Sequence, residues 1–301
     1  MGLARGAIKM IAETIRDYHL RGRVLVIGKQ DVWGTGQEVK RWLADSGLSP
    51  QAGTVELSLK GPLRDRGFVQ DISVFQLMGF QEVVTLDNSD FEGAQVIHDL
   101  NLAVTEPMLA RVGRFDLVID SGCLEHVFDV SQVLSNFFTL AKVNGVIIHI
   151  SPSTNHIDHG FYMFSPTLFQ DYYGANQFKI LRHLLFQYRH PLSRRKWKAY
   201  HYLPGALAPF SFGGMPKGLF GIFIAAQKQA HSTCNAVVQQ SAYRAAWSQN
   251  RAAQQPSRNQ NRLQRIARHV PTRLVPFLQS FYDKTRTVGG LGRYLDHYQD
   301  L

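Results

Sequence analysis

The feature that most constrains the fold is a series of short apolar runs that alternate with helix-like segments over the first part of the chain. The runs are residues 23–28, 82–87, 94–99, 115–120 and 145–151. Between the last two runs, residues 130–140 place apolar side chains at helical spacing. This alternation predicts an α/β fold with a largely parallel sheet. Two longer apolar runs, residues 178–189 and 219–227, predict two further strands.

Four of these runs end in a residue suited to contact with a ligand. One ends in Gly28, and three end in Asp87, Asp99 and Asp120. Turn preference explains any one of these aspartates, but not their occurrence after successive strands. Because ligands of open parallel sheets bind beyond the carboxyl ends of the strands, the sequence predicts a ligand site at that edge.

The loop after the first run has an unusual composition. The stretch "VIGKQDVWGTG" (26–36) has the layout of a strand, a tight loop and a helix start that hold a nucleotide. Lys29, Gln30 and Asp31 stand where a second glycine is expected. Asp87 follows Gly28 by 59 residues, whereas a dinucleotide fold expects about 20. This spacing argues against NAD and requires residues 48–70 to be an insertion that leaves the sheet intact.

The charge is unevenly distributed along the chain. The net charge is +10, and residues 172–282 contain lysine and arginine but no aspartate or glutamate. This run indicates either an anionic partner or a dispersed basic surface that aids solubility. We expect one domain over residues 1–228, with a loop at 190–218, and a basic helical extension over 229–301. Its basic amphipathic helix at 262–270 is suited to packing on its own domain or to an anionic membrane surface.

Cysteine content and hydropathy bear on the location of the protein. Cys123 and Cys234 are the only cysteines, which excludes a disulfide framework. No uninterrupted apolar run has the length of a membrane span, and the N-terminal segment resembles an amphipathic helix instead of a secretory signal. We therefore expect a cytoplasmic protein.

The ordered series of strand ends resembles a class I S-adenosylmethionine-dependent methyltransferase of the small-molecule group. The strongest part of the resemblance is "SGCLEHVFDV" (121–130), and the matching region runs from about residue 23 to 227. The resemblance implies a Rossmann-like seven-stranded sheet, mostly parallel, with an antiparallel last strand. It also implies S-adenosyl-L-methionine as the cofactor.

The resemblance assigns roles to residues at the strand ends. Gly28 and its neighbours would pass under the methionine part, and Gln30 and Lys29 can bind its charged groups. Asp87 would bind the ribose hydroxyls, Asp99 and Leu100 would flank the adenine, and Asp120 would begin the pocket floor. The complete set of expected cofactor residues is Gly28, Lys29, Gln30, Asp87, Asn88, Asp99, Leu100, Asp120, Ser121 and Gly122.

The segment after the fifth run contains the candidate catalytic residues. A sulfonium methyl is already activated, but an oxygen or nitrogen acceptor also needs a base to remove its proton. Residues 149–166 contain His156 and His159, which are our first candidates for this base, and His126 is the third. His149 alternates along the strand, so we expect it to be buried. Phe161, Tyr162 and Phe164 are expected walls for the acceptor.

The same histidines also permit a metal-binding interpretation. His156 and His159 have the spacing His-x-x-His, and Glu125 and His126 could join them in space. This spacing is not distinctive on a loop, and a metal site needs three or four converging ligands. The sequence therefore predicts no metal. Cys123 has no evident His–acid pair beside it, which argues against a nucleophilic role.

These observations favour methyl transfer from S-adenosylmethionine to a small-molecule or glycan-type acceptor. An anionic acceptor would suit the basic run of residues 172–282. The methylated atom is expected to be oxygen or nitrogen. An alternative is a non-catalytic module that binds a partner or an anionic membrane surface through residues 229–301. A nucleic-acid substrate is disfavoured, because "SPST" (151–154) is a poor match to the signature of amino-methylating DNA enzymes. The sequence makes no prediction of the oligomeric state.

Overall fold

The structure is a computed structural model that describes residues 2–190, 193, 195–211, 213–252, 274 and 291–301. The chain divides into two compact units. The first comprises Met1–Tyr202, Gly218–Val238 and Asp296–Leu301, and the second comprises Leu203–Lys217 and Gln239–Leu295. The described part of the second unit includes α8 (Ser241–Ala252) and two short 3-10 turns, Ala208–Phe210 and Leu291–Arg293.

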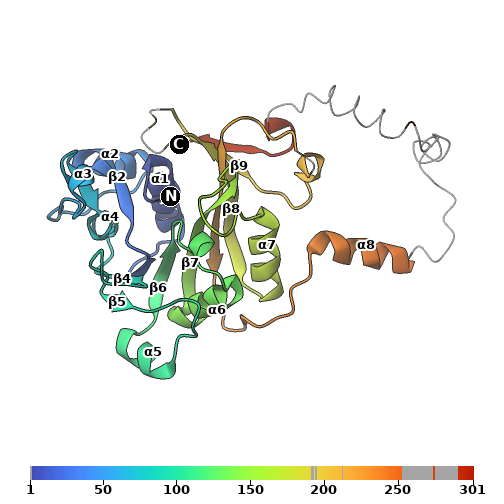
Figure 1. The fold of residues 1–301 in the computed structure, drawn as a ribbon, viewed down its shortest axis with the longest axis horizontal. Coiled ribbons are helices and arrows are strands. Elements are labelled where there is room, and N and C mark those ends of the chain that lie inside the picture. The colour runs from blue at the N-terminus through green and yellow to red at the C-terminus, as the bar shows by residue number, and fades with distance from the viewer. Residues whose placement is uncertain (1, 191–192, 194, 212, 253–273, 275–290) are drawn as a thin grey trace. The chain divides into compact units, whose positions relative to one another are not determined.

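The first unit is built on one large sheet (Figure 1). Among the described residues this sheet has nine strands, in the order β11-β9-β8-β10-β7-β6-β1-β4-β5. Their bounds are β1 (Arg23–Ile27), β4 (Glu82–Asp87), β5 (Val96–Ile97), β6 (Phe115–Asp120), β7 (Ala141–Thr154), β8 (Lys179–Tyr188), β9 (Lys198–His201), β10 (Leu219–Gln227) and β11 (His297–Asp300).

The pairing of these strands confirms the predicted fold class. β5, β4, β1, β6 and β7 are parallel neighbours, and β10 is antiparallel to both β7 and β8. The seven predicted strands are therefore present, and the last of these seven, β10, is the antiparallel one. Two strands of this large sheet were not predicted. β9 lies in the segment expected to be a loop, and β11 lies in the expected extension and pairs with β9.

Short helices cover the sheet, and their starts follow local sequence signals. They are α1 (Arg5–Asp17), α2 (Gly36–Asp45), α3 (Gly61–Arg64), α4 (Asp71–Leu77), α5 (Glu106–Val112), α6 (Val130–Leu140) and α7 (Pro166–Ala175). At α2, Thr35 and Glu38 form a reciprocal capping box. At α6, the Asp129 side chain accepts from the Gln132 amide.

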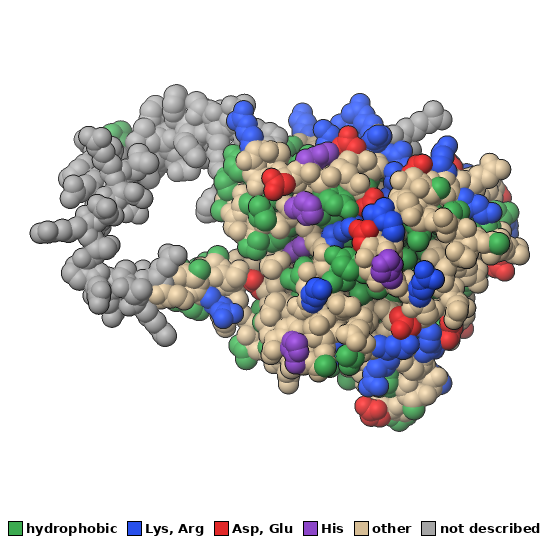
Figure 2. All heavy atoms as spheres, turned by 180° about the vertical axis from the view of Figure 1, so that it is seen from behind, with side chains coloured by type: hydrophobic (Ala, Val, Ile, Leu, Met, Phe, Trp, Pro, Cys, Tyr) green, Lys and Arg blue, Asp and Glu red, His purple; other side chains and the backbone are tan. Residues whose placement is uncertain are grey.

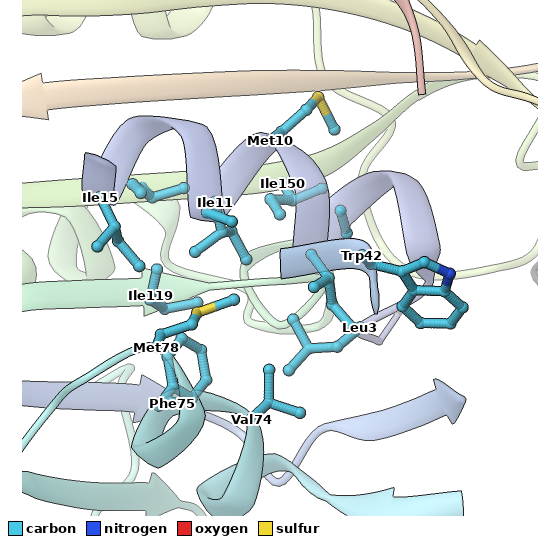
Figure 3. Close-up of a cluster of buried hydrophobic side chains, with 14 of the residues drawn as sticks. Leu3, Met10, Ile11, Ile15, Trp42, Val74, Phe75, Met78, Ile119 and Ile150 are labelled. Carbon is cyan, nitrogen blue, oxygen red and sulfur yellow. The ribbon is translucent and has the colours of Figure 1, made fainter. Parts of the chain in front are cut away.

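The main hydrophobic core lies between α1, α2 and α4 and one face of the sheet (Figure 3). α1 contributes Ile8, Ile11 and Ile15, which recur at helical spacing and are buried. Ile119 of β6 and Ile150 of β7 meet them from the sheet. Since successive side chains of a strand point to opposite faces, Asp120 and His149 face the other layer, against Phe137 of α6 and Phe169 of α7.

The predicted insertion at residues 48–70 leaves the large sheet intact. It contains α3 and β3 (Phe68–Gln70), and β3 pairs with β2 (Asp31–Thr35) in a separate two-stranded sheet. β2 was not predicted, since residues 29–36 were expected to be a loop. The first loop of the nucleotide-type layout is therefore short and ends in a strand, and Asp71 follows β3 directly at the start of α4.

Of the basic extension, only part can be compared with the expectation. α8 is a helix in that region, and the amphipathic helix expected at 262–270 lies outside the described residues. On the face drawn in Figure 2, lysine and arginine side chains are spread over the surface, with aspartate and glutamate among them. Within the described residues, we found no helix with the length and apolarity needed to cross a bilayer.

Candidate functional site

The strand ends that the sequence singled out meet at one edge of the sheet. Ile27 is in register with Leu86 of β4 and Asp120 of β6, so Gly28 lies beside Asp87 and between these two strands. The Gly28 amide donates to the Leu86 carbonyl at 2.7 Å. Gly28 has a φ of 70°, which a glycine adopts without steric cost. The structure thus brings together Gly28, Asp87 and Asp120.

Asp87 holds the loop that follows β1. Its Oδ2 accepts from the Lys29 amide at 3.0 Å, and its Oδ1 accepts from the Asn88 amide at 2.6 Å. A carboxylate oxygen has two lone pairs, so each can accept one more hydrogen bond. The half-buried Asp87 carboxylate therefore fits the two hydroxyls of a ribose.

Lys29 and Gln30 are engaged with Asp71, which the sequence analysis missed. Lys29 Nζ lies 2.6 Å from Asp71 Oδ1, and the backbone amide of Gln30 donates to Asp71 Oδ2 at 2.9 Å. The Gln30 side-chain amide donates to the Ile27 carbonyl at 2.9 Å. The side chains of Lys29 and Gln30, which were expected to bind the cofactor, thus each bond to another residue of this chain. No local signal could have revealed Asp71, because its partner Lys29 is 42 residues away.

Asp120 has a different environment from that expected of a pocket residue. It is completely buried, and its Oδ1 accepts from the amides of Cys123 and Leu124 at 3.0 and 3.1 Å. Its Oδ2 lies 2.8 Å from His149 Nδ1. Asp120 therefore shapes the turn that carries Ser121 and Gly122, instead of presenting its own carboxylate at the surface.

Asp99 and Leu100 follow β5 at the same edge. Oδ1 of Asp99 accepts from both the amide and the side chain of Asn101, at 2.9 and 2.8 Å, and these bonds lower the pKa of Asp99. Leu100 is buried, and its carbonyl accepts from Asn136. Asn88 is exposed.

Two hollows flank the loop after β1. The larger, about 550 Å³, lies between the loop, the insertion and the segment after β4. The smaller, about 290 Å³, is bounded by the loop, Ser121, Gly122, Trp33 and His159. Lys29, Gln30 and Asp31 line both. Their volumes are at the scale of small-molecule sites. Asp87, Asp99 and Leu100 are not among the described residues that line either hollow.

The three candidate bases form one cluster. The ring centroids of His126 and His159 are 5.2 Å apart, and those of His156 and His159 are 5.7 Å apart. Burial lowers the pKa of His126 and of His156, and the neighbouring His159 adds to this effect in both. His156 Nε2 lies 3.3 Å from the Tyr188 hydroxyl. His159 alone of the three lines the smaller hollow, and it is solvent-exposed.

Glu125 lies at the centre of this cluster. It is completely buried, and among the described residues neither of its carboxylate oxygens has a hydrogen-bond partner. His159 Nε2 is 3.6 Å from Glu125 Oε1, and His126 Nε2 is 4.0 Å from the same atom. Ligand atoms of these three residues lie within 4.8 Å of one another. The structure therefore brings together three residues that could hold a divalent ion. The sequence analysis considered this convergence of Glu125 and His126 with the histidine pair but predicted no metal.

The remaining expectations concern residues around the cluster. Phe161 is exposed and packs edge-on against Phe128, with ring centroids 5.8 Å apart. Phe164 is buried against Phe169, so it belongs to the core and is not a wall of either described hollow. Burial raises the pKa of the Cys123 thiol well above its usual value, which keeps it a thiol and argues against a nucleophile.

The seven predicted strands of the sheet are mostly parallel, and β10, the last of them in the chain, is antiparallel, as the resemblance implies. The fold is that of the class I methyltransferases. No family model matches the sequence, and no curated protein matches it.

Solved structures of methyltransferases resemble this chain in fold at low identity. A 1,6-didemethyltoxoflavin-N1-methyltransferase from Burkholderia thailandensis is 15% identical, with 74% of this chain and 79% of that chain covered and a TM-score of 0.34. A SAM-dependent methyltransferase from Archaeoglobus fulgidus is 14% identical, with 75% of this chain and 95% of that chain covered and a TM-score of 0.39. The N-methyltransferase NodS from Bradyrhizobium japonicum is 8% identical, with 73% of this chain and 94% of that chain covered and a TM-score of 0.37.

Proposed function

We propose that this chain transfers a methyl group from S-adenosylmethionine to an oxygen or nitrogen of a small-molecule acceptor. The observation that carries the proposal is the meeting of Gly28 and Asp87 at one sheet edge, beside a hollow with His159 in its wall. A class I methyltransferase sheet binds its cofactor at that edge. The cofactor would supply an activated methyl group, so the protein has to bind, orient and deprotonate.

Each part of the site has a task in this reaction. Asp87 would accept hydrogen bonds from the ribose hydroxyls, and Gly28 would let the backbone approach the cofactor closely. His159 would accept the proton of the acceptor, since its ring lines the smaller hollow. His156 and His126 lie beside it, and their lowered pKa keeps both neutral and able to accept a proton near neutral pH.

For the acceptor we propose a chemical class and a location. The run of residues 172–282 without carboxylates supports an anionic or glycan-type acceptor. The larger hollow is unfavourable for an anion, because its wall has more carboxylates than ammonium groups. The ammonium groups are those of Lys29 and Lys60, and the carboxylates are those of Asp31, Asp71, Asp90 and Glu92. We therefore assign the acceptor to the smaller hollow, where His159 is available.

One specific observation favours a second candidate, a non-catalytic module that binds a partner or an anionic membrane surface. Gln30 Nε2 lies 3.4 Å from the position that a Cβ on Gly28 would occupy, and Cys123 Cβ is 3.6 Å from it. These side chains narrow the space over Gly28 where a cofactor would pass. Under this candidate, the loop would be closed and residues 229–301 would make the contact.

Titration calorimetry with S-adenosylhomocysteine separates the two candidates. Micromolar binding would support methyl transfer, and the absence of binding at millimolar ligand would reject it. A methyl-transfer screen with labelled S-adenosylmethionine would then compare phosphorylated sugars, neutral glycosides and phenols. Binding to anionic vesicles without any binding of S-adenosylhomocysteine would support the module.

A further inference from the structure

The Asp71 side chain is a buried carboxylate with three polar partners beside the loop after β1. It is 1% exposed, and Lys29, whose Nζ lies 2.6 Å away, is 10% exposed. Asp71 Oδ1 also accepts from the Ile72 amide at 2.9 Å, and Oδ2 accepts from the Gln30 amide at 2.9 Å. One buried carboxylate therefore binds an ammonium group and two backbone amides.

These contacts provide partners for a loop that lacks the usual glycines. A nucleotide-binding loop usually relies on successive glycines, whereas this loop has Lys29, Gln30 and Asp31 after Gly28. Larger side chains restrict the backbone and need partners when they are buried. Asp71 supplies the partner of Lys29 and holds the backbone of Gln30. Asp87 holds the amide of Lys29 from the other side, at 3.0 Å.

The conformation of this loop decides the shape of both hollows. Lys29, Gln30 and Asp31 are shared by their walls. The Gln30 side chain bonds to the Ile27 carbonyl and lies close to Gly28. A movement of the Gln30 backbone would therefore move its side chain over Gly28 or away from it.

We propose that Asp71 is the positioning residue of the cofactor loop: by binding Lys29 and the Gln30 amide, it holds residues 28–31 in the conformation that admits the adenosyl cofactor. This inference rests on the proposed function. It gives Asp71, which follows the insertion at the junction of β3 and α4, an indirect part in cofactor binding. Asp71 itself does not touch the reacting atoms.

The test compares four proteins: wild type, Asp71→Asn, Lys29→Met and the double variant. In Asp71→Asn, an amide group would face either Lys29 or the Gln30 amide, which are both donors, so the loop loses a partner. We expect Asp71→Asn to weaken S-adenosylhomocysteine binding about 10- to 100-fold, because the apparent affinity falls with the fraction of protein whose loop is in the binding conformation. The double variant should recover part of the loss, because the buried ammonium is then absent.

A matched control separates positioning from general destabilisation. Glu13 is also a buried carboxylate, and Arg182 Nη1 lies 3.4 Å from its Oε2. Glu13→Gln should lower the melting temperature but leave the affinity for S-adenosylhomocysteine within about twofold, because α1 contributes no residue to either hollow. Equal losses of affinity in Asp71→Asn and Glu13→Gln would overturn the proposal, as would wild-type affinity in Asp71→Asn.

Hydrogen exchange gives a readout that does not need a ligand. Asp71→Asn should speed exchange in a peptide covering residues 26–36 more than in the rest of the sheet, and Glu13→Gln should not. If wild type binds no S-adenosylhomocysteine, the proposed function fails and the cofactor role of Asp71 fails with it. If wild type binds but exchange at 26–36 is unchanged in Asp71→Asn, only the positioning role is wrong.

Discussion

His149 Nδ1 lies 2.8 Å from Oδ2 of Asp120, and both side chains are completely buried. His149 Nε2 is in turn 2.6 Å from the Tyr173 hydroxyl. Because Oδ1 of Asp120 accepts from two backbone amides of the following turn, this network joins β6, β7 and α7 to the segment that carries Ser121 and Gly122. His149 is thus a structural residue, as its position in the strand predicted.

The first prediction concerns the stability of this network. Asp120→Ala should lower the free energy of unfolding by about 3–5 kcal/mol, because it leaves His149 and two amides without their buried partner. Urea unfolding followed by circular dichroism measures the change. Asp116→Ala is the control, since its ion pair with Lys142 is partly exposed, and its loss should be smaller. Equal losses in the two variants would contradict the role assigned to the network.

The second prediction concerns the ribose site. Asp87→Ala should weaken binding of S-adenosylhomocysteine about 10- to 100-fold, because hydrogen bonds to a charged acceptor contribute about 1.5–3 kcal/mol. Calorimetry on the variant and on Asp65→Ala gives the comparison, since Asp65 is an exposed residue at the end of α3. Undiminished affinity in Asp87→Ala would place the cofactor elsewhere.

The third prediction concerns the base. Once an acceptor is found, His159→Ala should lower the rate of methyl transfer about 100-fold or more and leave S-adenosylhomocysteine affinity unchanged. His156→Ala and His126→Ala should have smaller effects, because their rings do not line the smaller hollow. His231→Ala, at an exposed position, is the control. A larger loss in His156→Ala or His126→Ala than in His159→Ala would transfer the role to that residue.

The fourth prediction concerns divalent ions. With His159 as the base, treatment with a chelator followed by gel filtration should leave the rate of methyl transfer unchanged. A rate that falls on chelation and returns with added Mn²⁺ or Zn²⁺ would assign Glu125, His126 and His159 to a metal site instead. Glu125→Gln should then lose the response to added metal, because a neutral amide is a poorer ligand than a carboxylate.

The fifth prediction concerns pH and the buried His183. Burial lowers the pKa of His183 to about 3. Because the unfolded chain has the higher pKa, it binds more protons in acid, so stability should fall as the pH drops below about 6.5. Between pH 6.5 and 5 the loss from this residue should approach about 2 kcal/mol.

Urea unfolding at pH 7.5 and pH 5 measures this dependence. His183→Phe removes the titrating group and keeps a ring beside Tyr202, with which His183 packs at a centroid distance of 4.6 Å. The variant should show a smaller difference between the two pH values than wild type. His231→Phe should retain the wild-type difference, because residue 231 is exposed.

Two strands of the sheet and two contacts of the site could not be predicted from the sequence. β9 and β11 are four-residue strands with polar and charged residues, and they lack a long apolar run. β11 pairs with β9 from a distant part of the chain, and β9 pairs with the preceding strand β8. Neither short strand has an apolar pattern from which it could be predicted. The ion pair of Lys29 and Asp71 and the convergence of Glu125 with His159 depend in the same way on how separate loops are brought together.

The sequence by itself determined the class of fold and the edge at which Gly28 and the aspartates meet. Apolar periodicity reports which segments are buried as strands, and parallel strands necessarily bring their carboxyl ends to one edge. Only the tertiary structure decided that Asp120 is buried beneath the site, that Asp87 remains half-buried beside it, and that Asp71 holds the loop between them. Burial and pairing depend on contacts between residues far apart in the chain, and these contacts exist only once the sheet and its covering helices have packed.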